Sequence, residues 1–296
     1  MPKNNTFETV TICSGPALPG LAASYLRALW AKGSKDAGPL RACALLEQLP
    51  LQQLQAYQQL CQWPQLSPQL SPPPCWLQLV SFPLQLKLVT HPRFPLPAMG
   101  LVHLENRIEY FCPLDSAIAV DFNCCTEAAQ PHEKGRTVAL ITEARQAERL
   151  IWRSRAVYLQ RLRTPSSRQE QPAVTIRYAS QSAEWPLPVS LGWRYGRVSG
   201  DLNPIHLHPL LARLFGFTAN IAHGMWSKAR CLSELAAQGL LPEPPYQVEV
   251  RFAKPILLPA QVQLHWQSSG QSINFALCSA DGVRCHLQGA VTTISR

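Results

Sequence analysis

One segment of the chain places a carboxylate and an imidazole at a spacing that suits proton transfer; residues 195–206 read YGRVSGDLNPIH. The Ser-Gly-Asp run that ends at Asp201 is typical of a turn, and Pro204 suits the first turn of a helix, where a backbone N–H has no partner. Asp201 would then precede the positive end of that helix, where its ionised form is favoured. Because His206 follows five residues later, the two side chains could hold one water molecule and move its protons.

A second segment, residues 220–226, reads NIAHGMW and opens a stretch with helical periodicity through Leu235. Its glycine, Gly224, stands where the helix is expected to begin. A glycine there leaves backbone N–H groups accessible to an oxygen anion. A water activator and an oxyanion donor together suit the addition of water to an α,β-unsaturated thioester, because hydroxide must reach C3 while the enolate oxygen is stabilised.

The two segments resemble the signature of the MaoC family of hydratases and dehydratases. Residues 195–206 resemble its hydratase-2 motif, an aromatic residue followed by (Ser/Thr)-Gly-Asp-x-Asn-Pro-(apolar)-His, and residues 221–225 resemble its hydrophobic-x-His-Gly-(Met/Leu) helix start. Residues 251–255 (RFAKP) resemble the strand that follows in the family, although Pro259-Ala260 stands where Pro-Gly is usual. Residues 94–106 are more loosely similar to the first half of members that carry two hot-dog units.

This resemblance implies an α+β double hot-dog fold, in which two long helices are each wrapped by an antiparallel sheet and one chain mimics a dimer. It implies that Asp201 and His206 form the catalytic dyad and that the Gly224 N–H completes the oxyanion hole. The implied reaction is reversible syn hydration of a trans-2-enoyl-CoA, or of an enoyl-carrier-protein thioester, to the (3R)-3-hydroxyacyl thioester. Coenzyme A would enter as part of the substrate, so we expect no separate cofactor, no metal, and a setting in lipid metabolism.

Four further residues are candidates for binding the substrate: Asn203, His223, Arg251 and Lys254. Asn203 could equally hydrogen-bond its own turn, and His223 could simply begin the helix. Arg251 and Lys254 could reach coenzyme A phosphates, although solvated charges at strand ends are common. Gly224 has a structural alternative as well, since a glycine can be required for close helix–strand packing.

Two other functions remain open at this point. A hot-dog thioesterase would direct the activated water to the thioester carbonyl in place of C3, whereas a non-catalytic acyl-CoA-binding subunit would keep the fold without the chemistry. The Asp-x-Asn-Pro-x-His spacing favours the hydratase, and an intact dyad disfavours the binding subunit. A zinc site at His206, His208 and His223 is disfavoured because no Asp, Glu or Cys stands at the usual ligand spacing from them.

The composition of the whole chain limits which other functions and locations are expected. The net charge of +9 invites a nucleic-acid partner, but the basic residues are scattered and no nucleic-acid-binding motif accompanies them, so an anionic small substrate is favoured. The ten cysteines include no Cys-x-x-Cys pair, the N-terminus lacks a secretory signal pattern, and every apolar run is too short to span a bilayer. We therefore expect a cytoplasmic protein that is not inserted in a membrane, acts on an acyl-CoA or acyl-carrier-protein thioester, and can form a homodimer.

Changes in composition and in apolar spacing along the chain predict two units of the same type. Residues 1–160 are expected to form an N-terminal hot-dog-like domain without the motif, residues 161–186 a linker, and residues 187–296 the catalytic domain. The apolar alternation at Val120 and Phe122 parallels that at Val262 and Leu264, which indicates a duplicated unit of helix followed by strands.

Periodicity also predicts individual elements. Leucines between Leu40 and Leu60 have helical spacing, and residues 77–88 form a second apolar helical stretch. The expected strands of the C-terminal domain are Tyr246–Phe252, Ala260–Trp266, Ile273–Cys278 and His286–Ile294.

Overall fold

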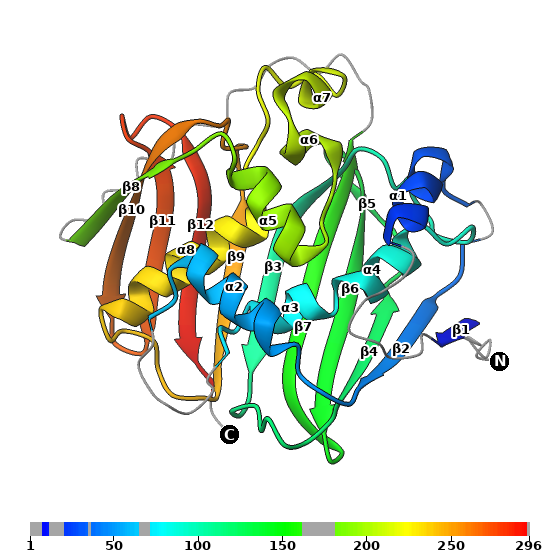
Figure 1. The fold of residues 1–296 in the computed structure, drawn as a ribbon, viewed down its shortest axis with the longest axis horizontal. Coiled ribbons are helices and arrows are strands. Elements are labelled where there is room, and N and C mark those ends of the chain that lie inside the picture. The colour runs from blue at the N-terminus through cyan, green and yellow to red at the C-terminus, as the bar shows by residue number, and fades with distance from the viewer. Residues whose placement is uncertain (1–7, 12–20, 35–36, 65–71, 162–180, 295–296) are drawn as a thin grey trace.

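The computed structural model describes residues 8–11, 21–34, 37–64, 72–161 and 181–294. The elements of the N-terminal half are β1 (Glu8–Thr11), α1 (Leu21–Trp30), β2 (Leu40–Leu46), α2 (Leu51–Cys61), α3 (Trp76–Val80), α4 (Phe82–Val89), β3 (Leu101–Tyr110), β4 (Val120–Thr126), β5 (Gln130–His132), β6 (Gly135–Gln146) and β7 (Arg149–Arg161). Those of the C-terminal half are β8 (Gln181–Leu187), α5 (Leu191–Ser199), α6 (Pro204–Leu207), α7 (Pro209–Arg213), α8 (Gly224–Ala237), β9 (Tyr246–Phe252), β10 (Ala260–Ser269), β11 (Ser272–Ser279) and β12 (Cys285–Thr293) (Figure 1).

The strands of both halves join into one continuous sheet. Among the described residues it has twelve strands in the order β1-β2-β4-β6-β7-β3-β9-β12-β11-β10-β8, with β5 paired to β6. The halves meet where β3 pairs antiparallel with β9, Ile108 opposite Val248. On the two sides of this junction the strands succeed one another in the same way, so β7, β6, β4 and β2 correspond to β12, β11, β10 and β8. The duplication predicted from the sequence is therefore visible in the sheet.

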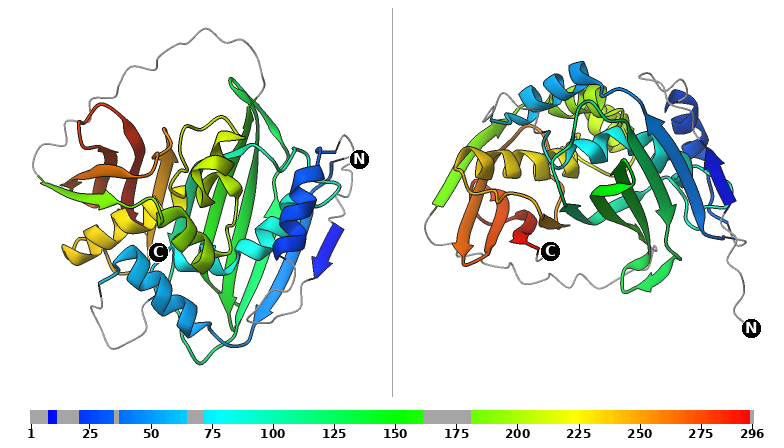
Figure 2. Two further views of the ribbon diagram at one scale, coloured as in Figure 1. Left: turned by 45° about the horizontal axis from the view of Figure 1, so that its top comes forward. Right: turned by 90° about the horizontal axis from the view of Figure 1, so that it is seen from below.

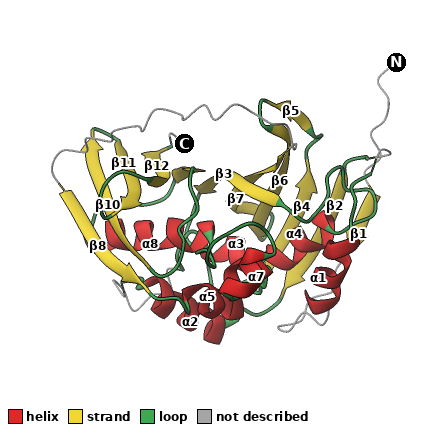
Figure 3. Ribbon diagram, turned by 90° about the horizontal axis from the view of Figure 1, so that it is seen from above, coloured by secondary structure: helices red, strands yellow, loops and turns green. Residues whose placement is uncertain are grey.

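The sheet curves around the helices, which gather on its concave side. Figure 3 shows α8, α3 and α4 next to the strands and α2, α5 and α7 farther out, and Figure 2 shows the same curvature in two further views. Helix α8 is buried along most of its length, as expected for a helix enclosed by a sheet on one side and other helices on the other. One hydrophobic cluster contains side chains of both halves, including Leu88, Trp152, Leu232 and Phe275, so the halves share a core.

One buried lysine lies at the junction of the two halves. The Lys228 side chain, which comes from α8, is fully buried. Its Nζ donates to the Asn106 O (3.1 Å), the Asn106 Oδ1 (2.7 Å) and the Val248 O (3.1 Å). These three acceptors belong to β3 and β9, so one side chain binds α8 to both strands of the junction.

The central helix of the N-terminal half is divided. The expected helix over residues 77–88 is confirmed, but it is made of α3 and α4, which meet at Ser81. Pro83 lies in the first turn of α4, where its missing N–H is tolerated, whereas inside one continuous helix it would remove a hydrogen bond.

The expected helical spacing between Leu40 and Leu60 is wrong for its first part. Leu40–Leu46 is strand β2, in which the buried Leu40 and Ala42 flank the exposed Arg41. This alternation is the period of two that a strand requires, and β2 pairs with β1 and β4. Only the later leucines belong to a helix, α2.

The four strands expected in the C-terminal half are confirmed as β9 to β12. Part of the expected linker is also a strand, because Gln181–Leu187 forms β8 and pairs with β10. Arg161, the first residue of the expected linker, ends β7, and residues 162–180 lie outside the described residues. No helix in the described ranges has both the length and the apolar character needed to cross a membrane.

Candidate active site

Asp201 lies in a tight turn between α5 and α6. Gly200 ends α5 in the left-handed conformation (φ +75°), which a glycine adopts without strain. The Ser199 hydroxyl accepts the Asp201 N–H at 3.1 Å, and Asp201 Oδ1 accepts the Asn203 N–H at 3.3 Å. The turn predicted from Ser-Gly-Asp thus fixes the carboxylate just ahead of α6.

His206 is buried in α6 and bound to the segment that precedes α8. Its Nδ1 lies 2.8 Å from the Ile221 O, and since a carbonyl can only accept, Nδ1 carries the proton and Nε2 keeps a lone pair. The Asn220 side-chain amide donates to the His206 O at 3.2 Å, and the Ile221 N–H donates to the Ile205 O at 3.0 Å. These bonds hold the imidazole in one tautomer and one orientation.

Two glycines allow α5 to pack directly on this segment. A Cβ on Gly192 would overlap the His206 carbonyl oxygen, and a Cβ on Gly196 would lie 2.9 Å from the Asp201 O. Any larger residue at Gly192 would push α5 away from α6. The backbone that carries both Asp201 and His206 therefore rests on a glycine face of α5.

His223 joins the two predicted residues as the N-cap of α8. Its Nε2 donates to the Asp201 backbone O at 3.0 Å, and its ring stacks on that of His206 with centroids 3.6 Å apart and planes 25° apart. The Tyr195 ring lies 4.7 Å from the His223 ring. The sequence interpretation of His223 as the residue that begins the helix is in keeping with this position, which also brings it against Asp201.

The surroundings set opposite proton states for the acid and the imidazoles. Burial raises the pKa of the Asp201 carboxyl, but His223, His206, the Asn203 N–H and the Tyr25 hydroxyl outweigh it, so that pKa lies below its usual value. Burial lowers the pKa of His206, despite the opposing effect of Asp201. Burial also lowers the pKa of His223, to about 3. At neutral pH the cluster therefore holds one carboxylate and two neutral imidazoles.

This cluster suits water better than a metal ion. One ligand-type atom from each of Asp201, His206 and His223 lies within 4.8 Å of the others. However, the two imidazoles are stacked nearly parallel, so their in-plane lone pairs do not converge on one point as ligands of a single ion must. An ionised carboxylate beside an imidazole lone pair can accept both protons of one water molecule.

Gly224 is the first residue of α8, as predicted. Its N–H belongs to the first turn, which has no intrahelical acceptor, so it can donate to an oxygen anion. The packing alternative is also present, because a Cβ on Gly224 would lie 3.0 Å from Cε1 of Phe252. The two roles are compatible, since a missing side chain both admits Phe252 and exposes the N–H.

The other predicted binding residues lie farther from this cluster or have structural partners. The Asn203 side chain caps α6 by accepting the Ile205 N–H at 3.4 Å. Arg251 forms an ion pair with Glu105 at 2.9 Å, across the β3–β9 junction. Lys254 is exposed in the loop after β9. No hydrogen bond or ion pair of the described residues joins Arg251 or Lys254 to Asp201.

The N-terminal half brings residues to the site that the sequence did not reveal. The Tyr25 hydroxyl, from α1, lies 3.0 Å from Asp201 Oδ1. His103 of β3 stacks on Tyr158 with ring centroids 4.7 Å apart and lies 4.9 Å from the Phe252 ring that packs on Gly224. Tyr25 comes from a segment with no recognisable motif, and the looser resemblance over residues 94–106 gave His103 no role, so no local pattern brought either residue to the site.

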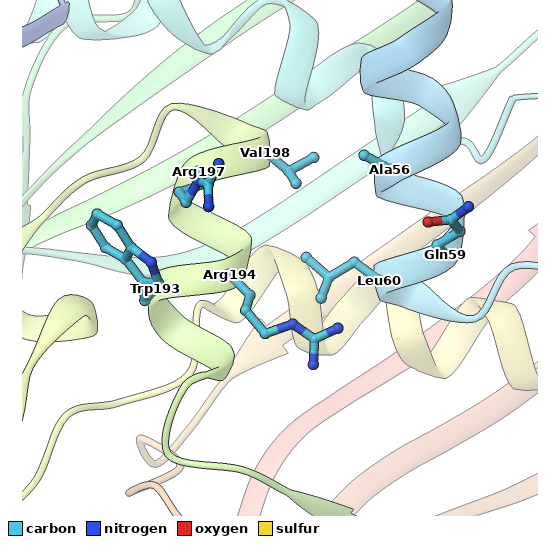
Figure 4. A pocket seen from close by; sticks show the side chains of 7 residues that line it. All are labelled: Ala56, Gln59, Leu60, Trp193, Arg194, Arg197 and Val198. Carbon is cyan, nitrogen blue, oxygen red and sulfur yellow. The ribbon is translucent and has the colours of Figure 1, made fainter.

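A separate pocket lies between α2 and α5 (Figure 4), with a volume of about 310 Å³. Trp193, Arg194 and Arg197 of α5 line it, whereas the Tyr195 ring lies against His223 and Gly196 lies against the Asp201 carbonyl. It is therefore not the space between Asp201 and His206. Its lining residues are Ala56, Gln59, Leu60, Trp193, Arg194, Arg197 and Val198.

Comparison with known proteins links this site to one family. Residues 167–283 match the sequence model described as MaoC like domain. The 3-hydroxyacyl-thioester dehydratase X of Mycobacterium tuberculosis is 34% identical over 193 residues, which are 63% of this chain and 66% of that protein. The peroxisomal multifunctional enzyme type 2 of Drosophila melanogaster is 30% identical over 107 residues, 36% of this chain and 17% of that enzyme.

Solved structures confirm the double hot-dog fold. The crystal structure of HtdX from Mycobacterium tuberculosis superposes with a TM-score of 0.71 at 29% identity, covering 85% of this chain and all (100%) of the other. The full-length Drosophila melanogaster multifunctional enzyme has a TM-score of 0.66 at 18% identity, covering 94% of this chain and 52% of the other. A further Mycobacterium tuberculosis protein, described as having a double hot-dog fold, has a TM-score of 0.52 at 12% identity over 88% of this chain and 96% of its own. The chain therefore belongs to the MaoC-like dehydratase family, with its MaoC like domain in residues 167–283.

Proposed function

We propose that this protein catalyses the reversible hydration of a trans-2-enoyl thioester to the (3R)-3-hydroxyacyl thioester, with Asp201 and His206 activating water. The observation that carries the proposal is the pairing of an ionised carboxylate with a neutral imidazole whose Nε2 is unprotonated, beside the first turn of α8. The name of the mycobacterial relative, a 3-hydroxyacyl-thioester dehydratase, supports the same substrate class.

Each group has one task in the proposed reaction. Asp201 and His206 hold a water molecule, and its oxygen bonds to C3 while one proton passes to the dyad. The electron pair of the C2–C3 double bond moves towards the thioester oxygen, where the Gly224 N–H stabilises the developing enolate. The dyad then returns a proton to C2, so one water is added and the protein regains its starting state.

The finer assignments belong to the same proposal. We assign Lys254, which is exposed after β9, to a phosphate of coenzyme A. Arg251 would contribute less to phosphate binding, because it is already paired with Glu105. His223 and Asn203 would act mainly by holding the Asp201 turn. The N-terminal half would support the catalytic half, and two chains would form a homodimer.

The compartment is also a proposal. Nine of the ten cysteines fall within the described residues, and these nine are free thiols. Free thiols are typical of proteins from a reducing compartment such as the cytoplasm.

The test mixes purified protein with crotonyl-CoA and with a longer trans-2-enoyl-CoA. We expect the ultraviolet absorbance of the enoyl thioester to fall without release of free thiol, and chiral analysis to give the (3R) alcohol. Thiol release would replace the proposal with the thioesterase. Binding of either thioester without any turnover would replace it with the acyl-CoA-binding subunit.

A further inference from the structure

Helix α1 packs on the turn that carries Asp201, although the two are far apart in sequence. Leu21, Tyr25 and Ala28 recur at helical spacing and so share one face of α1. Ala28 is buried, and the Leu21 side chain lies so close to Gly200 that a Cβ there would be 2.9 Å from Leu21 Cδ1. This face of α1 is thus fitted against the end of α5, where only a glycine leaves room.

The Tyr25 hydroxyl makes three polar contacts with the turn. Its oxygen accepts the Leu202 N–H at 2.8 Å. Its single proton has two acceptors within reach, Asp201 Oδ1 at 3.0 Å and the Gly200 O at 3.1 Å. A hydrogen bond to an ionised carboxylate is stronger than one to a neutral carbonyl, so the proton is directed at Asp201.

This arrangement distinguishes the two carboxylate oxygens. Oδ1 accepts from the Tyr25 hydroxyl and from the Asn203 N–H. Oδ2 lies 3.8 Å from His223 Nε2, beyond hydrogen-bond distance, and the proton of that nitrogen is donated to the Asp201 backbone O instead. One oxygen is therefore held by two donors, and the other is left to exchange protons.

Other titratable groups also face Asp201, but they do not hold its Oδ1. They are Tyr195 from α5, His206 from α6, His223 at the start of α8, His103 from β3 and Tyr158 from β7. Burial, followed by Asp201, raises the pKa of Tyr25 far above its usual value, so Tyr25 keeps its proton throughout the working range of pH.

We infer that Tyr25 is a positioning residue of the active site: its hydroxyl holds Oδ1 of Asp201 and leaves Oδ2 as the oxygen that exchanges protons with water. The part of this inference that concerns proton exchange by Oδ2 during hydration rests on the proposed function. It gives α1, which carries no recognisable motif, a defined part in the chemistry of the other half.

Tyr25→Phe tests this inference, because it removes the hydroxyl and keeps the ring. We expect kcat for enoyl-thioester hydration to fall about 10- to 100-fold, the effect of a misplaced reacting group, with KM changed less than about twofold. We also expect the acid limb of the pH profile to move to higher pH, because Asp201 loses a donor. Tyr110→Phe, which removes the hydroxyl of a buried β3 tyrosine that contacts Tyr246, should leave kcat and the profile as in the wild type.

A second measurement separates this inference from the proposed function. With ¹³C-labelled aspartate, assigned by Asp201→Asn, the carboxyl shift of Asp201 reports its pKa without any substrate. A higher Asp201 pKa in Tyr25→Phe supports the inference even if the wild type hydrates no enoyl thioester. An unchanged Asp201 pKa together with wild-type kcat overturns it. Equal losses of kcat in Tyr25→Phe and Leu21→Ala, with the Asp201 pKa unchanged in both, would also overturn it, since packing of α1 would then explain the effect.

Discussion

At the scale of single residues, the candidate site combines the half-buried Asp201 carboxylate with the buried His206 imidazole. Asp201 stays ionised because donors and imidazoles surround it, although burial alone would favour its neutral form. His206 stays neutral because burial disfavours its charged form and the Ile221 carbonyl fixes its tautomer. The pair is therefore ready for proton transfer at neutral pH without further adjustment.

Replacing Asp201 with Asn should abolish most of the activity and leave the fold intact. The amide keeps the size of the side chain and an oxygen for the Asn203 N–H, but it cannot take a proton from water. We expect a loss of about 10²–10⁴ in rate, the usual contribution of a positioned general base. Steady-state kinetics and thermal unfolding would check this, and wild-type turnover by the variant would remove Asp201 from the mechanism.

Buried neutral histidines should make the stability fall in mild acid. The pKa values of His103 and His223 are lowered to about 3, burial being the main cause in both. Between that value and the ordinary value of about 6.5 the unfolded chain binds protons that the folded chain does not, so the free energy of unfolding decreases as pH falls. Each such histidine contributes a slope of about 1.4 kcal/mol per pH unit within this window.

Urea unfolding at pH 7, 6 and 5 would measure this slope. His103→Asn, which removes one of the two groups, should make the decline shallower than in the wild type. A free energy of unfolding that is independent of pH between 7 and 5 would show that the surroundings of these imidazoles do not disfavour their charged forms.

At the scale of the elements, close approach between backbones decides whether the dyad forms. Helix α5 rests on the Asp201–His206 segment through Gly192 and Gly196, and the Asn220 side-chain amide donates to the His206 carbonyl of that segment. The segment is therefore held between α5 and the chain that leads into α8. Each of these three residues therefore sets where Asp201 and His206 lie.

Gly192→Ala should therefore damage both stability and activity. Its methyl group would overlap the His206 carbonyl oxygen, which is backbone and cannot move aside cheaply. We expect a loss of about 2 kcal/mol or more in the free energy of unfolding, as for other overpacked sites, together with reduced kcat. Ser190→Ala, at the N-cap of the same helix but without a capping hydrogen bond from its side chain, is the matched control and should change stability by less than about 0.5 kcal/mol. Equal stability of the two variants would contradict this packing.

Much of the C-terminal half could be predicted from sequence, because its signals lie within short stretches of neighbouring residues. Strands β9 and β10 alternate buried and less buried positions with period two, and Gly224 begins α8 where the motif indicated. The N-terminal half was harder because its signals conflict: the leucines of β2 imitate helical spacing, and Pro83 divides the central helix. Tyr25 could not be predicted at all, since its partner stands 176 positions away and only the folded sheet brings the two together.

At the scale of the whole molecule, the two halves form one sheet and one core. The β3–β9 pairing leaves neither strand as an edge, and Lys228 adds three hydrogen bonds across the same junction. Because Tyr25 of α1 also reaches Asp201, the C-terminal half alone would lack a sheet neighbour for β9 and one hydrogen-bond donor to Asp201.

Lys228→Met should destabilise the junction. Methionine matches the length of the side chain, but it leaves the Asn106 and Val248 acceptors without their donor in a buried setting. We expect a loss of about 1–3 kcal/mol in the free energy of unfolding, the cost of an unsatisfied buried polar group. Chemical denaturation would check this against Lys134→Met, a half-exposed lysine paired with Glu133, which should change stability by less than about 0.5 kcal/mol. Equal values for the two variants would mean that the Lys228 bonds contribute nothing.

Cutting the chain between residues 168 and 169 should yield fragments that depend on each other. Each fragment alone would expose a strand of the junction and the apolar core beside it, so we expect both to aggregate. Co-expression should restore soluble protein and hydratase activity. A soluble, active fragment of residues 169–296 would show that the halves are independent, and would also contradict the role given to Tyr25.

The burial of Lys228 has a consequence for how two such halves can pair. If two copies of the C-terminal half paired as a homodimer, each would bring its own lysine to the same seam, and two cations would meet there away from water. In this chain the seam holds one of them, because α4 opposite carries only the half-buried Lys87. A single buried cation at this junction therefore suits two unlike halves, and it would disfavour a symmetric pairing of two C-terminal halves.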